Sequence, residues 1–343
     1  MRRLSLGRFG LSLFSVVVVV CSVTAARAAE SFAGKSIEFV IGFGPGGAYD
    51  TYSRLIAKYI QNQIPGKPSV VPKNMQGAGS ARAANYLYFN APQDGTSIGM
   101  VGNGLYLSQQ LGEARIKFDM LQMNWIGRLT NNTPVLFAWS QSQVRSTDDL
   151  VKKGMIVAAD GATPKLNYAL LQALVGVNMK IISGYKHASE AMLAMERGEI
   201  HGLARPWPVI LASHADLVST GKIIPVLQTG AEKHEALPTV PRMIDLAKND
   251  ADRQLFEFIA QSSRIGQSVL APSRVPSDVV ALLRDAFMVA VNDPGFRADT
   301  KRAKLPLAIL DGKQLAALVK RDGQYPAAVV ARAKAVVKQV KGK

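Results

Sequence analysis

Residues 37–50 read IEFVIGFGPGGAYD, a short apolar run followed by a glycine-rich loop. The run 37–41 is predicted to be a strand. Apolar residues then recur on one face of a predicted helix over residues 50–63. This stretch therefore predicts a strand, a loop and a helix in succession, which is the repeating unit of α/β folds.

The same order of elements recurs along the chain. Further strands are predicted at 69–71, 97–101, 135–139, 155–159, 180–183, 199–204 and 223–228, with helices at 80–89, 164–175 and 188–197. The last part is predicted to be helical, at 277–292, 312–321 and 326–340. The alternation predicts an α/β fold class for most of the chain.

The first 28 residues have the pattern of an export signal. Arginines precede an apolar run over residues 9–20, and the small-residue pattern Ala26-Arg27-Ala28 follows. A membrane-spanning helix needs about 20 apolar residues, so a cleaved signal at 1–28 is favoured over an anchor. Cys21 is the only cysteine, and the mature chain is therefore expected to form no disulfide.

Length and charge narrow the function class. The mature chain is longer than one hydrophobic core usually serves, which predicts two domains. Removal of the signal lowers the formal charge from +16 to +12, because it contains four arginines and no acidic residue. This surplus favours anionic partners. The basic residues are dispersed and not interleaved with aromatic ones, so no nucleic-acid partner is expected.

Two loops are candidate ligand cradles, because each follows a predicted strand and precedes a predicted helix. Backbone N–H groups of glycine-rich loops and helix N-termini bind anions without basic side chains. The first loop lacks the GxxxxGK[ST] pattern and does not fit a dinucleotide-binding unit. The alternative is a plain turn in which Asp50 caps a helix. The candidate residues are Phe43, Gly44, Pro45, Gly46, Gly47 and Asp50 in the first loop, and Ala159, Asp160, Gly161, Ala162 and Thr163 in the second.

Several short motifs, in their order and spacing, resemble one protein family over nearly all the mature chain. They are the segment 37–50, VVPKN at 70–74, QGAGS at 76–80, APQDG at 91–95, GYK at 184–186, ERGEI at 196–200 and LPTVP at 237–241. Together they resemble the receptor components of tripartite tricarboxylate transporters, the Bug-type periplasmic solute-binding proteins.

The resemblance implies a periplasmic binding protein-like (Venus-flytrap) fold of two α/β lobes. One lobe would contain residues 29–134 plus 228–343 and the other residues 135–227, joined by a hinge of two crossings near 133–136 and 225–229. The cleft would hold a small carboxylate, a di- or tricarboxylate or an aromatic acid, largely through backbone groups of the two loops. The receptor, a periplasmic monomer without cofactor, would deliver this ligand to a membrane permease.

The chain departs from the family pattern at two positions that are commonly acidic, where it has His201 and Arg205. A cationic Arg205 favours a second anionic group on the ligand, which it can bind with two hydrogen bonds. The alternative is a structural ion pair with a neighbouring acid. Asn103 and Tyr185 each follow a predicted strand and are further candidates for the cleft.

Catalysis is not expected. No HExxH pattern or GxSxG nucleophile turn occurs in the chain, so neither a metal site nor a serine hydrolase is predicted. Two alternatives to a transport receptor stay open: an exported ligand sensor for a membrane signalling protein, and an exported enzyme.

Overall fold

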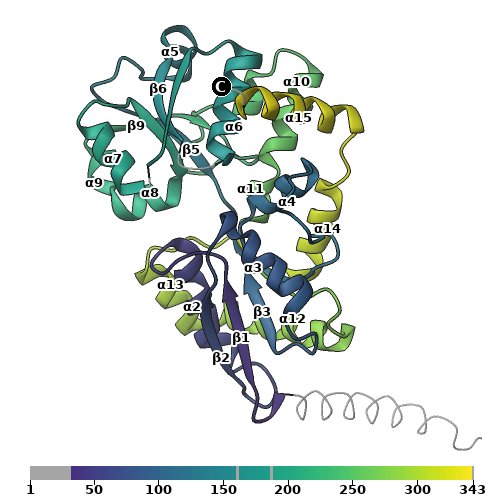
Figure 1. Cartoon of the computed structure of the whole chain (residues 1–343). Helices are drawn as coiled ribbons and strands as arrows, with labels where there is room; N and C mark the ends of the chain where they lie inside the picture. The colour runs from purple at the N-terminus through teal and green to yellow at the C-terminus, as the bar shows by residue number, and fades with distance from the viewer. Residues whose placement is uncertain (1–31, 160–161, 186–187, 342–343) are drawn as a thin grey trace, which may run out of the picture.

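The computed structural model describes residues 32–159, 162–185 and 188–341. The predicted signal at 1–28 lies outside these residues. The described chain forms two lobes, each built on its own β-sheet (Figure 1). We call the lobe with the six-stranded sheet the first lobe and the lobe with the five-stranded sheet the second.

The sheet of the first lobe has the strand order β11-β4-β10-β3-β1-β2. β1 pairs in parallel with β2 and β3, whereas β10 is antiparallel to both β3 and β4. Helix α2 buries its apolar face in the core beside this sheet together with α12. The bounds are β1 Ser36–Ile41, β2 Ser69–Asn74, β3 Ser97–Met100, β4 Asn124–Thr130, β10 Gln267–Ala271, β11 Leu310–Asp311, α2 Ala48–Ile60 and α12 Ser277–Asn292.

The sheet of the second lobe has the order β7-β6-β8-β5-β9. β6 is parallel to β7 and β8, and β5 is antiparallel to β8 and β9. Helices α6, α7 and α8 follow three of its strands; the alternation predicted α6 and α7 but not α8. The bounds are β5 Pro134–Trp139, β6 Met155–Ala159, β7 Met179–Ser183, β8 Gly202–Pro206, β9 Ile223–Gln228, α6 Ala162–Leu170, α7 Ala188–Glu196 and α8 Trp207–Ser213.

Two helices from the C-terminal third complete the core of the second lobe. Apolar residues of α10 (Asp250–Ala260) and α15 (Ala327–Lys341), such as Phe256 and Ala333, lie in one cluster with Val157 of β6. Figure 1 shows both helices beside α6. This differs from the expectation that residues 228–343 belong to the first lobe, because the second sheet needs these apolar faces to cover it.

Two of the passages between the lobes lie at segments other than those expected. The chain enters the second lobe between β4 and β5, beside the expected crossing near 133–136. The segment after β9 stays with the second lobe, where Gln228 bonds to the backbone of Pro241. The return runs from α10 through α11 (Ser262–Ile265) to β10, and a further passage joins α14 (Gly312–Asp322) to α15.

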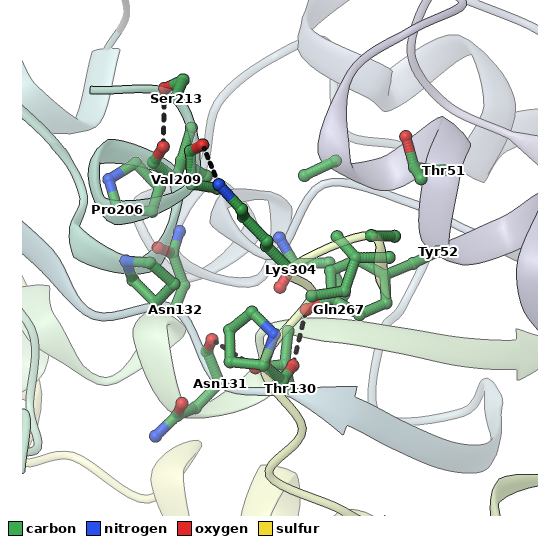
Figure 2. Close-up of a pocket in the computed structure, with 16 residues that line it drawn as sticks. Thr51, Tyr52, Thr130, Asn131, Asn132, Pro206, Val209, Ser213, Gln267 and Lys304 are labelled. Atoms are coloured by element: carbon green, nitrogen blue, oxygen red, sulfur yellow. Dashed lines mark hydrogen bonds between the residues drawn. The ribbon is translucent and has the colours of Figure 1, made fainter. Parts of the chain in front are cut away.

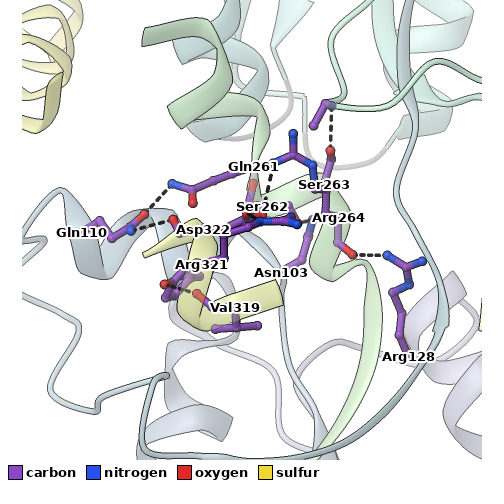
Figure 3. Close-up of polar contacts among 12 residues, drawn as sticks. Asn103, Gln110, Arg128, Gln261, Ser262, Ser263, Arg264, Val319, Arg321 and Asp322 are labelled. Carbon is purple, nitrogen blue, oxygen red and sulfur yellow. Dashed lines mark hydrogen bonds and ion pairs between the residues drawn. The ribbon is translucent and has the colours of Figure 1, made fainter. Parts of the chain in front are cut away.

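Polar contacts hold these passages together (Figure 3). Gln261 Nε2 donates to Gln110 Oε1 at 2.6 Å, and Arg264 Nη1 lies 3.2 Å from the buried carboxylate of Asp322. Arg128 Nη1 of β4 donates to the carbonyl of Arg264. The junction α10–α11 is therefore fixed to both the first-lobe sheet and the end of α14.

The predicted α/β fold class is confirmed by the two sheets. Several elements were not predicted, and α10 and β10 are among them. β10 is only five residues long between Gly266 and Pro272, yet it lies in the interior of the first sheet and is fully buried. Among the described helices, none combines the length and apolar character needed to cross a bilayer.

We expect Phe256→Ala to lower the free energy of unfolding by about 3–5 kcal/mol, because its fully buried ring joins α10 to the second core. The matched control is Phe89→Ala, whose side chain is 52% exposed and should change stability by no more than about 0.5 kcal/mol. Urea unfolding of both variants is the measurement. Equal, small losses would show that α10 contributes little to the second core.

Candidate functional site

A cavity of about 320 Å³ lies between the two lobes where the chain passes from one to the other. Both lobes and two of the passages contribute to it. The lining residues are Phe43, Asn103, Asn132, Pro134, Thr163, Pro164, Asn167, Ala204, Arg205, Pro206, Thr229, Ile259, Ala260, Ser262 and Ser263. The structure therefore brings together the predicted candidates Phe43, Asn103, Thr163 and Arg205.

The glycine-rich loop after β1 reaches this cavity through Phe43. Gly46 has φ +84°, a conformation that side chains disfavour, and Gly42 lies so close to Ser80 that a Cβ would be 1.8 Å from its hydroxyl. Gly44 is half-buried, and Pro45, Gly46 and Gly47 are exposed beside the cavity without lining it.

Asp50 lies behind the loop and fixes its shape. Its carboxylate is 5% exposed and accepts hydrogen bonds from the Gly46 amide at 3.0 Å, Asn74 Nδ2 at 2.8 Å and Arg54 Nε at 2.9 Å. Burial raises the pKa of this carboxyl, but the hydrogen bonds and the charge of Arg54 outweigh burial and hold the pKa below its ordinary value. In this arrangement Asp50 positions the loop.

Asn103 is held at the cavity by three hydrogen bonds. Its Oδ1 accepts from Tyr49 Oη at 3.0 Å, and its backbone N–H donates to Tyr49 Oη at 3.1 Å. Its Nδ2 donates to the Ser262 carbonyl at 2.7 Å. The Tyr49 ring packs against the Phe43 ring, with 4.3 Å between the ring centroids. Burial, partly offset by the bond from Asn103, raises the pKa of Tyr49 to about 12, so this hydroxyl stays protonated at neutral pH.

The second predicted cradle reaches the cavity through the first turn of α6. Thr163 and Pro164 line it, and the N–H groups at a helix start have no acceptor within the helix. The positive end of the α6 dipole therefore lies at the cavity. Ala159 is buried in the core at the end of β6. Asp160 and Gly161 lie outside the described residues, as does the side chain of Ala162.

The remaining candidates divide between the two ends of the second sheet. Arg205 lies near the end of β8, opposite Val135, and lines the cavity. His201 precedes the start of that strand, where its Nδ1 accepts a 3.4 Å bond from the Ile156 amide. Tyr185 packs with a core cluster beside the sheet, and neither it nor His201 lines the cavity.

Sequence reasoning missed several polar residues at the passages. Asn167 is 3% exposed, and its Oδ1, like that of Asn132, is buried without a hydrogen-bond partner among the described residues. Thr133 Oγ1 is likewise buried without a hydrogen-bond partner among the described residues. A polar stretch at 130–133 between two apolar strands was the signal available. Buried polar groups normally have partners, so these atoms indicate a place for a polar ligand or water.

The comparisons with known proteins agree with this geometry. A family model described as "Tripartite tricarboxylate transporter family receptor" matches residues 53–340. A Cupriavidus necator protein, "UPF0065 protein in gbd 5'region", is 24% identical, with 99% of this chain and 98% of that one covered.

Two solved structures share the fold. A ligand-free TctC solute binding protein from Polaromonas has a TM-score of 0.65 at 18% identity, covering 89% of this chain and 99% of the other. MatC from Rhodopseudomonas palustris with bound malate has a TM-score of 0.62 at 19% identity, covering 89% and 100%.

We expect Asp50→Asn to lower the free energy of unfolding by about 1–3 kcal/mol at pH 7, because it removes a buried charge that Arg54 and the Gly46 amide satisfy. A carboxyl whose folded-state pKa is depressed stabilises the fold above its unfolded pKa, about 3.9, and loses this contribution as pH falls through the folded value. The difference from wild type should therefore shrink toward pH 3.

Chemical denaturation at pH 7 and at about pH 3 measures both effects. Asp285→Asn is the matched control, because Asp285 is exposed on α12. A loss for Asp50→Asn that is independent of pH would contradict a role for the ionised carboxylate.

Proposed function

The chain belongs to the tripartite tricarboxylate transporter receptor family, and from this premise we propose that it captures a small carboxylate in the cavity between its lobes. The family and the fold are those of solute-binding receptors, and we infer that the bound molecule is released unchanged. The malate in the MatC structure supports a carboxylate as the ligand class.

The observation that carries the proposal is the electrostatic character of the cavity. Of the described residues that line it, Arg205 is the one with a charged side chain, and none is acidic. The start of α6 adds the positive end of a helix dipole. Together with the Nδ2 groups of Asn132 and Asn167, which can donate, these groups favour an anion that accepts several hydrogen bonds.

The arrangement of the passages supports capture by lobe closure. Phe43 and Asn103 come from the first lobe, whereas Thr163, Asn167 and Arg205 come from the second. A ligand that contacts both sets gains more contacts when the lobes approach, and this difference in affinity favours the closed form. We place the receptor in the periplasm, where the closed form would meet a membrane permease.

A thermal-shift screen of the mature protein tests the ligand class. At a hundredfold excess over Kd, a binding carboxylate should raise Tm by about 5–10 °C, with amino acids and sugars as comparison ligands. Thr163→Trp fills the cavity at the start of α6 and should abolish the rise, whereas Thr220→Trp, an exposed control, should keep it. No rise with any carboxylate, or steady conversion of the acid detected by mass spectrometry, would contradict the proposal.

Arg205 is expected to hold a second anionic group of the ligand. A charge-assisted hydrogen bond contributes about 1.5–3 kcal/mol, so Arg205→Met should weaken a dicarboxylate about ten- to a hundredfold and leave the matching monocarboxylate nearly unchanged. Calorimetry with both ligands measures this, with exposed Arg274→Met as the control. Equal losses for the two ligands would assign Arg205 a structural role.

A further inference from the structure

A second cavity of about 210 Å³ lies beside the first, also between the lobes (Figure 2). The start of α2 and residues 303–306 form its first-lobe walls, and α8 forms its second-lobe wall. The lining residues are Ala48, Thr51, Tyr52, Thr130, Asn131, Asn132, Pro206, Pro208, Val209, Ala212, Ser213, Gln267, Ala303, Lys304, Leu305 and Pro306.

The character of this cavity differs from that of the first. Its two facing walls are largely apolar: Pro208, Val209 and Ala212 on one side, and Leu305 and Pro306 on the other. Val209 is 39% exposed, so part of its apolar side chain is in contact with water. An apolar group placed between these walls would remove that surface from water.

The two cavities are adjacent. Asn132 and Pro206 line both of them and therefore form their shared boundary. Lys304 spans the second cavity from the first lobe, and its Nζ lies 3.5 Å from the carbonyl of Ala212 on α8 (Figure 2). A molecule bound in the first cavity beside Asn132 therefore lies next to the second cavity.

We propose that the second cavity is a subsite for the apolar part of the ligand, so that the receptor selects carboxylic acids that carry an alkyl or aryl chain. The carboxylate lies in the first cavity, near Asn167 and the start of α6, and the chain lies between α8 and residues 305–306. The inference rests on the proposed carboxylate-binding function. It goes beyond that function because it assigns a chain-length preference to residues outside the carboxylate cavity.

Calorimetry with straight-chain monocarboxylates from butanoate to decanoate tests the subsite. Affinity should rise about two- to fourfold for each added methylene until the second cavity is filled, and then level off. Ala212→Trp, which fills the second cavity from α8, should abolish this gain and leave the affinity for butanoate within about twofold of wild type. Ala212→Leu, a smaller change, should shorten the chain at which the gain stops.

Ala281→Trp on the exposed face of α12 is the matched control and should leave the whole series unchanged. A series with no gain in wild type overturns the subsite, while binding of the short acids keeps the carboxylate function intact. An equal loss of affinity for short and long acids in the Ala212→Trp variant also overturns the subsite, because the substitution then acts on lobe closure and not on the chain of the ligand. If no acid binds wild type, the proposed function itself fails.

Discussion

The core of the second lobe is completed by α10 and α15, helices from a later part of the chain, and this packing determines the layout of the molecule. Because α15 follows elements of the first lobe, the chain has to return to the second lobe after building parts of the first. Burying one large apolar side chain contributes about 1.5–3 kcal/mol, and several such residues on the two helices make this packing a major source of stability. The lobes are consequently joined by several connecting segments, which lie close together between the lobes.

The candidate cavity lies where these connecting segments come together. Asn132 belongs to the passage from β4 to β5, and Ser262 and Ser263 belong to the passage from α10 to α11. The same backbone that must bend when the lobes move therefore also lines the cavity. The hydrogen bond from Asn103 to the Ser262 carbonyl ties the first-lobe loop to this junction. In the proposed closure, the same residues would both contact the ligand and bend with the hinge.

The periodicity of apolar residues was sufficient to predict the α/β class and most strands, because alternating strand and helix patterns are local. β10 was missed because a five-residue strand carries little periodic signal, and its place between β3 and β4 depends on pairing with distant segments. Phe43, Asn103, Thr163 and Arg205 could be predicted for the cavity because loops after parallel strands meet at one edge. Asn132, Asn167 and Ser263 could not, since their position follows from how the lobes pack. His201 was a candidate because it stands where the resembling family commonly has an acidic residue, but it precedes the start of β8, whereas Arg205 lies near the end of that strand.

The late return of α15 has a consequence for how the protein acquires its structure. A chain that emerges with its N-terminus first presents β5 to β9 long before residues 327–341 follow. Until then the second sheet exposes the apolar face that α15 covers, and the contacts that cover it span more than 150 residues of sequence. Contacts of such long separation slow folding and leave intermediates open to aggregation. The core of the second lobe can therefore be completed only after residues 327–341 are available.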